Sequence, residues 1–136
     1  MRIFLDTSVL LAACGSSTGA SRELFRLASE RDWSLVASPY VLSEVEHNLA
    51  DLPGDAVGTW EILGKELSIW PDVLTMNFPV VFSVSKDRPV LFTAIAWADV
   101  LLTLDRKDFG ALIGTGFYGL AIQTPGIFLH RQRGME

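Results

Sequence analysis

Residues 1–13 read MRIFLDTSVLLAA, and this stretch decides the expected fold. The apolar run Arg2–Asp6 (RIFLD) predicts a buried strand, and Ser8–Cys14 predicts a short helical segment directly behind it. Asp6 lies where the strand gives way to the helix. A carboxylate among apolar neighbours is costly to remove from water unless something pairs with it. Lys and Arg are absent from residues 7–21, so any positive partner of Asp6 must come from elsewhere in the fold.

Beyond this stretch, short apolar strands alternate with segments of helical periodicity. The further predicted strands are Ser34–Ala37 (SLVA), Ile69–Leu74, Asp99–Leu104 (DVLLTL) and Leu120–Gln123. Apolar strands that alternate with helices indicate a parallel sheet covered on both faces. We therefore expect one α/β domain over residues 1–136, a three-layer α/β/α fold with a central parallel sheet. The stretch Met76–Ser85 (MNFPVVFSVS) fits either a loop or a strand.

The composition favours a compact domain in a reducing compartment. Of the 136 residues 49% are hydrophobic, and the single Cys14 excludes an internal disulfide framework and a cysteine-based zinc site. We see no secretory signal and no apolar stretch of the ~20 residues that a membrane span needs, so we expect a cytoplasmic protein without a membrane partner. The net charge of −5 is uneven: residues 1–85 hold 5 basic and 11 acidic side chains, whereas residues 86–136 hold 6 and 5. Long-range attraction of nucleic acid would therefore be weak.

Four acidic residues are placed to meet at one edge of the predicted sheet. Ligands of such sheets bind beyond the carboxyl ends of the strands, and Asp6 and Asp105 each follow a strand. Glu44 lies in the helix that leaves the second strand, and Asp87 lies at the start of a predicted helix over Arg88–Ala98. Four carboxylates in one place raise one another's pKa unless a cation neutralises them. Because Mg²⁺ and Mn²⁺ prefer oxygen ligands, this pattern predicts a divalent metal centre.

The chain resembles the PIN-domain nucleases in FLDTSVLLAA, SPYVLSEVEHNL, KDRPVLFTA, ADVLLTLDRKDF and the tail GLAIQTPGIFL. This family includes the VapC-type toxins of bacterial toxin–antitoxin pairs. The resemblance implies a metal-dependent endoribonuclease that cuts single-stranded RNA with Mg²⁺ or Mn²⁺. It implies catalytic and metal-binding roles for Asp6, Glu44, Asp87 and Asp105, and supporting hydroxyls at Ser8 and Thr103. The partners it implies are an antitoxin protein and a second copy in a homodimer.

Several charged residues near these acids have more than one interpretation. Four basic side chains bracket two of the acids, and either contact RNA phosphates or form a solvated surface: Lys86, Arg88, Arg106 and Lys107. Asp108 could approach the site from the short helix predicted over Lys107–Ile113. Asp99 begins its strand instead of ending it, and we expect it at the opposite edge of the sheet as a cap or turn residue.

Two alternatives to a nuclease follow from the same residues. Taken singly, Asp6 and Asp87 could merely cap helices and Glu44 could be solvated. A catalytically inactive PIN-like binding or assembly module is favoured by the acidic balance and by residues 75–85, whereas the presence of all four acids counts against it. An aspartyl-phosphate enzyme is less well supported, because Ser8 stands two positions after Asp6, where haloacid dehalogenases have a second Asp.

Residues 114–119 read GTGFYG and match the dinucleotide fingerprint G-x-G-x-x-G only in form. They precede a strand instead of linking a strand to a helix, and no acidic residue follows at the spacing that a ribose requires. We interpret them as a glycine-rich loop.

Overall fold

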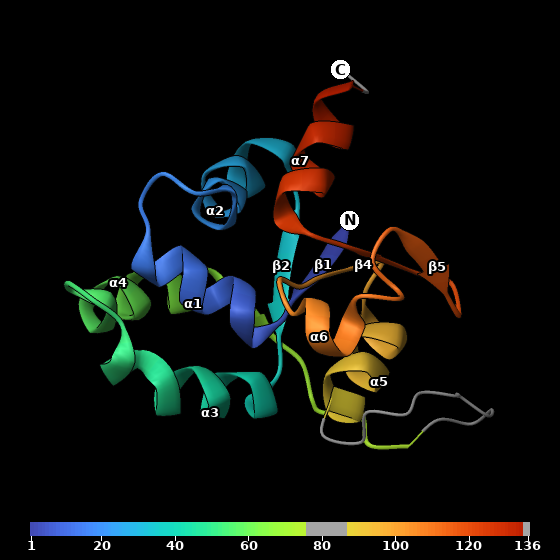
Figure 1. Ribbon diagram of the computed structural model, residues 1–136, viewed down its shortest axis with the longest axis horizontal. Helices are drawn as coiled ribbons and strands as arrows, with labels where there is room; N and C mark the ends of the chain where they lie inside the picture. The colour runs from blue at the N-terminus through green and yellow to red at the C-terminus, as the bar shows by residue number, and fades with distance from the viewer. Residues whose placement is uncertain (76–86, 135–136) are drawn as a thin grey trace.

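The computed structural model describes residues 1–75 and 87–134 and shows a three-layer α/β/α fold (Figure 1). Across these residues, the sheet has six strands in the order β3-β2-β1-β4-β6-β5. The strands are β1 (Arg2–Leu5), β2 (Ser34–Ala37), β3 (Ser68–Ile69), β4 (Val100–Leu102), β5 (Thr115–Phe117) and β6 (Leu120–Gln123). The stretch Met76–Ser85 and Lys86 lie outside the described residues, so the predictions made for them stay predictions.

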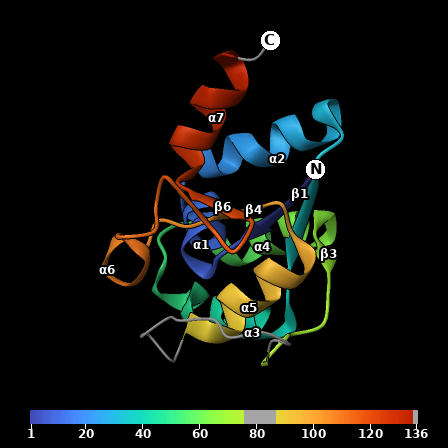
Figure 2. The ribbon, with the colours of Figure 1, turned by 90° about the vertical axis from the view of Figure 1, so that its right-hand side faces the viewer.

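Helices cover the sheet on both faces. Figures 1 and 2 place α1 and α4 on one side and α5 on the other, and α7 packs against α2. The α-helices are α1 (Thr7–Gly15), α2 (Ala20–Arg31), α3 (Pro39–Asn48), α4 (Ala56–Leu63), α5 (Arg88–Trp97), α6 (Arg106–Phe109) and α7 (Pro125–Gly134). Two 3₁₀ turns, η1 (Leu49–Asp51) and η2 (Gly64–Glu66), follow α3 and α4. In residues 1–75 and 87–134, none of the helices combines the length and apolar character that a membrane span requires.

The inner strands are buried on both faces, as their apolar sequences predict. Ile3, Phe4 and Leu5 of β1 and Leu101 and Leu102 of β4 have no exposed surface. The two strands pair in parallel, with Leu5 opposite Leu102. The residues that follow them, from Asp6 and from Thr103, therefore leave the sheet side by side at its carboxyl edge.

One strand departs from the predicted parallel sheet. The stretch GTGFYG, expected as a loop, contributes β5, which pairs antiparallel with β6 at the edge of the sheet. The loop prediction was wrong for Thr115–Phe117 because the tight turn at Tyr118 and Gly119 folds these residues back onto β6. Both turn residues have positive φ, 51° and 83°, as the two-residue hairpin turns that match strand twist require.

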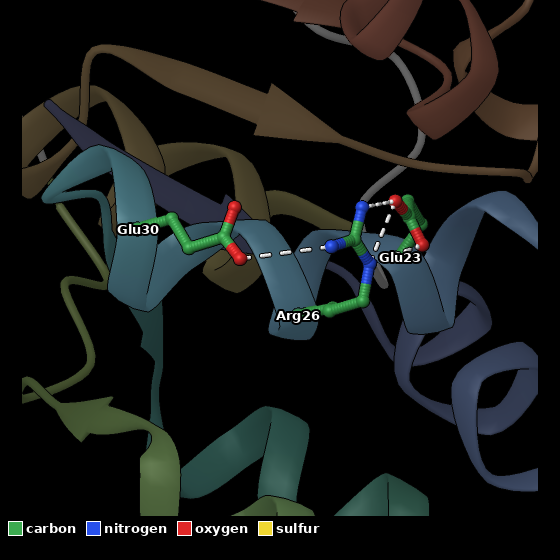
Figure 3. Close-up of polar contacts among 3 residues, drawn as sticks. All are labelled: Glu23, Arg26 and Glu30. Atoms are coloured by element: carbon green, nitrogen blue, oxygen red, sulfur yellow. Dashed lines mark hydrogen bonds and ion pairs between the residues drawn. The ribbon is translucent and has the colours of Figure 1, made fainter.

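Helix α2 shows how acidic residues outside the carboxyl edge are accommodated. Its apolar side chains face the core, and on its outer face Arg26 lies between Glu23 and Glu30 (Figure 3). The Arg26 Nε donates to Glu23 Oε1 at 2.9 Å, and this hydrogen bond lowers the pKa of Glu23 below its ordinary value. On this face both carboxylates lie beside a cation and in contact with water.

Candidate metal centre

Asp6 is a buried carboxylate whose contacts come from amide and hydroxyl groups. It is 6% exposed and caps α1, because its Oδ1 accepts a hydrogen bond from the Thr7 amide at 2.8 Å. Its Oδ2 accepts from Thr103 Oγ1 at 2.8 Å and from Ser8 Oγ at 3.3 Å. The partners of this carboxylate thus offer only partial positive charge, whereas Arg26, the partner of Glu23, carries a full positive charge.

The environment of Asp6 disfavours its charged form. Burial raises the pKa of Asp6 above its ordinary value, and the negative charge of Glu44 acts in the same direction. The hydrogen bonds from Thr103, Thr7 and Ser8 lower the pKa without cancelling the effect of burial. A cation at this edge would relieve both the desolvation and the repulsion.

Glu44 is brought to Asp6 by the residue that follows Asp6. Glu44 is half-buried on α3, and its Oε1 accepts a hydrogen bond from Thr7 Oγ1 at 3.0 Å. Thr7 therefore holds Asp6 through its backbone and Glu44 through its side chain. The sequence carried no signal for this pairing, because 37 positions separate the two residues.

Three aspartates form a second group at the same edge. Asp87, Asp105 and Asp108 are half-buried, and each offers a carboxylate oxygen that lies within 4.8 Å of the other two. Asp105 caps α6, since its Oδ1 accepts from the Asp108 amide at 3.0 Å. Asp87 stands at the N-cap position of α5. Asp108, which the sequence allows to approach the site from the helix after Asp105, joins this group, and its i, i+3 spacing from Asp105 places both on one side of a helical turn.

The hydroxyl groups of Thr103 and Ser8 link Asp6 to the segment that follows β4. Thr103 has no exposed surface, and its Oγ1, which donates to Asp6, accepts from the Asp105 amide at 3.0 Å. Ser8 Oγ accepts from the Leu104 amide at 3.0 Å. The structure thus places two groups of acids at the carboxyl edge of the sheet: Asp87, Asp105 and Asp108 in mutual reach, and Asp6 and Glu44 joined through Thr7. We call this set the acidic centre: Asp6, Glu44, Asp87, Asp105 and Asp108.

The donor set fits a hard divalent cation. All the candidate ligands are carboxylate oxygens, which Mg²⁺ and Mn²⁺ prefer. Octahedral coordination at about 2.1 Å separates the ligand oxygens by roughly 3 to 4 Å. One oxygen each of Asp87, Asp105 and Asp108 lies within 4.8 Å of the other two, which is close to these separations.

The remaining predicted residues lie around or away from this centre. The basic side chains of Arg88, Arg106 and Lys107 are exposed and directly follow Asp87 and Asp105 in sequence. Asp99 lies at the opposite edge, as predicted, where its Oδ2 accepts from the Arg2 amide at 2.8 Å.

Comparisons with known proteins agree with this architecture. A sequence model of the PIN domain matches residues 2–107. The chain is 31% identical over 102 residues to glutamyl-tRNA reductase 2 of Koribacter versatilis (strain Ellin345). The matched residues make up 75% of this chain and 22% of that protein. The chain therefore spans about a fifth of that relative's length. Its fold matches the crystal structure of VapBC2 from Rickettsia felis bound to a DNA fragment from their promoter. The TM-score of this match is 0.66 at 16% identity, over 91% of this chain and 98% of that chain.

Proposed function

Because this chain belongs to the PIN-domain family, whose members are generally nucleases, we propose that it is a metal-dependent endoribonuclease acting on single-stranded RNA. The observation that carries the proposal is the acidic centre itself. Asp87, Asp105 and Asp108 each offer an oxygen within 4.8 Å of the other two, and Thr103 links Asp6 to the Asp105 amide at the same edge of the sheet. Burial and the charge of Glu44 both raise the pKa of Asp6. A cation that binds there would stabilise the charged carboxylate, which adds a reason for it to bind.

The residues of the acidic centre divide the work of phosphodiester hydrolysis. Asp87, Asp105 and Asp108 would hold the Mg²⁺ or Mn²⁺ ion, with Asp6 completing the negative environment. When bound, such an ion neutralises the carboxylates and makes water a stronger acid. Glu44, oriented by Thr7, would accept the proton of the attacking water. The hydroxyls of Ser8 and Thr103 would keep Asp6 fixed while charge develops.

The basic residues beside the acidic centre would position RNA. The exposed side chains of Arg88, Arg106 and Lys107 are close in sequence to the metal-binding acids and offer donors to phosphate oxygens. Lys86, next to Asp87 in the chain, is proposed for the same role. These contacts would act at short range, because the net charge of −5 does not attract a polyanion from a distance.

A homodimer, which the family resemblance implies, is a further part of the proposal. A regulatory partner is another. The structure of similar fold contains a complex, VapBC2, with a promoter fragment of DNA. By analogy we propose that this chain is the toxin of a toxin–antitoxin pair, whose antitoxin would cover the acidic centre.

Cleavage of single-stranded RNA by the purified chain tests the proposal. We expect cleavage with Mn²⁺ or Mg²⁺, none in EDTA, and none with Asp6→Asn. The matched control is Asp99→Asn, since Asp99 also accepts a backbone hydrogen bond but lies at the opposite edge of the sheet. Equal cleavage by the Asp6→Asn protein, or cleavage in EDTA, would overturn the assignment.

One observation favours an inactive PIN-like binding module as the second candidate. Asp6 and Asp105 both cap helices, so each carboxylate has a structural use without any metal. Calorimetric titration with Mn²⁺ separates the candidates: a binding module would show no tight site, whereas a nuclease shows one that Asp105→Asn removes.

A further inference from the structure

The chain between β3 and α5 is tied to three neighbouring elements by residues 70–73, which we call the 70–73 clasp. The Trp70 amide donates to the carbonyl of Ala37, the last residue of β2, at 3.0 Å. The carboxylate of Asp72 contacts α3, and the amide of Val73 contacts α5. The clasp thus lies between the helix that carries Glu44 and the helix that Asp87 precedes.

Helix α3 is capped by Asp72 instead of by its own N-cap residue. Ser38 occupies the N-cap position with no exposed surface, but its Oγ has no hydrogen-bond partner within residues 1–75 and 87–134. Pro39 has no amide hydrogen, so Tyr40 provides the first N–H of the helix. This N–H points to Asp72, whose Oδ2 and Oδ1 lie 3.1 and 3.3 Å from the Tyr40 nitrogen. A residue distant in sequence therefore supplies the cap of α3.

Helix α5 is fastened to the same clasp by two hydrogen bonds. The Val73 amide donates to Thr93 Oγ1 at 2.9 Å, and Trp97 Nε1 donates to the Pro71 carbonyl at 2.9 Å. The rings of Trp70 and Trp97 are in contact, with centroids 5.2 Å apart. Contacts along the helix from Thr93 to Trp97 fix both the rotation and the depth of α5.

We propose that Asp72 is a positioning residue that holds α3 against α5 and so sets Glu44 relative to Asp87. The inference rests on the proposed function, since the distance between these carboxylates matters only where they serve one reaction. Glu44 lies one turn along α3 from the capped Tyr40, so movement of the helix start moves Glu44 with it. Catalytic and metal-binding groups tolerate displacements of only about 0.5 Å.

Three variants separate positioning from simple stability. Asp72→Ala removes the acceptor, and Asp72→Asn keeps an acceptor oxygen for Tyr40 without the charge. Asp55→Ala is the matched control, because Asp55 caps α4 by accepting from the Gly58 amide at 3.1 Å, away from the acidic centre. We expect a similar fall in Tm for the two alanine variants. Only Asp72→Ala should lower kcat for RNA cleavage with Mn²⁺, at least fivefold, and Asp72→Asn should restore it to within twofold.

Amide NMR spectra of the metal-free proteins give a second measurement. The resonances around Glu44, around Asp87 and of the Trp97 indole N–H should shift in Asp72→Ala and return in Asp72→Asn. Unchanged resonances, or an equal loss of kcat in Asp55→Ala, would overturn the positioning role. If the unmodified chain cuts no RNA with Mn²⁺, the proposed function fails, and the NMR comparison alone still decides whether Asp72 sets the two helices.

Discussion

Replacing Thr103 by Val tests how the acidic centre is held together. The substitution keeps the shape of a fully buried side chain and removes one hydroxyl, which donates to Asp6 Oδ2 at 2.8 Å and accepts from the Asp105 amide at 3.0 Å. A hydrogen bond to a charged group contributes about 1.5–3 kcal/mol and a neutral one about 0.5–1.5 kcal/mol. We therefore expect a loss of about 2–4 kcal/mol in the free energy of unfolding.

This loss corresponds to a large shift in melting temperature. The entropy of unfolding is about 2.1 cal/mol/K per residue, or roughly 0.3 kcal/mol/K for 136 residues. A loss of about 3 kcal/mol therefore lowers Tm by about 10 °C. The matched control is Thr93→Val, which removes an equally buried hydroxyl that accepts from the Val73 amide and donates to the Pro89 carbonyl. Both of its bonds are neutral, so its cost should be about 1–3 kcal/mol.

The pH dependence of the two losses should differ. The Thr103 hydroxyl stabilises the charged form of Asp6, so its removal raises the pKa of Asp6 in the folded state even further. A folded-state pKa above the unfolded one costs stability as pH rises through it, because the folded protein must give up a proton it binds more tightly. The deficit of Thr103→Val should therefore be largest at neutral pH and shrink as acid protonates Asp6. The deficit of Thr93→Val should stay constant.

Urea denaturation in EDTA, at several pH values for the three proteins, measures these deficits. The same small loss for both variants, with no change between neutral and acidic pH, would refute a charge-assisted bond between Thr103 and Asp6.

Other parts of the structure predict separate outcomes. Asp105→Asn keeps the acceptor for the α6 cap but lowers the ligand charge, so calorimetry should show at least a tenfold weaker Mn²⁺ affinity with little change in Tm. The double change Arg106→Ala and Lys107→Ala should raise KM for RNA more than it lowers kcat. It should also reduce the salt dependence of binding by about 1.4 in logarithmic slope, as expected for two lost phosphate contacts. Gly119→Ala, at φ 83°, should cost about 1 kcal/mol in urea denaturation, whereas Gly116→Ala, with open space around it, should cost less.

The fold followed from sequence where apolar patterning was strong. The strands over Ser34–Ala37 and Leu120–Gln123 have the predicted bounds, because continuous apolar runs leave little choice of structure. Patterning failed at both edges of the sheet. Thr115–Phe117 forms a strand through its turn to β6, and the strand predicted over Ile69–Leu74 stops at Ile69. Beyond Ile69, the Trp70 amide makes one more bond to β2, Pro71 offers no amide hydrogen, and Asp72 and Val73 bond to helices.

The acidic centre was predictable only as far as chain topology determines it. Parallel strands bring Asp6 and Asp105 to one edge, which sequence order alone implies. The inclusion of Asp108 depends on the rotation of a four-residue helix, and the link from Thr7 to Glu44 depends on how α1 packs on α3. Such details arise from packing between distant segments, which periodicity does not report.

The order of strands has a consequence for how the molecule opens. Strand β1 lies between β2 and β4, and β4 lies between β1 and β6, so the segments preceding Asp6 and Asp105 are bonded on both sides. The borders of the sheet are formed by the two-residue β3 and the three-residue β5. Amide hydrogen exchange should therefore be fastest at these borders and slowest in the interior pair. Fraying of the borders would leave the interior pair closed, and Asp6 and Asp105 would keep their arrangement until the whole domain unfolds.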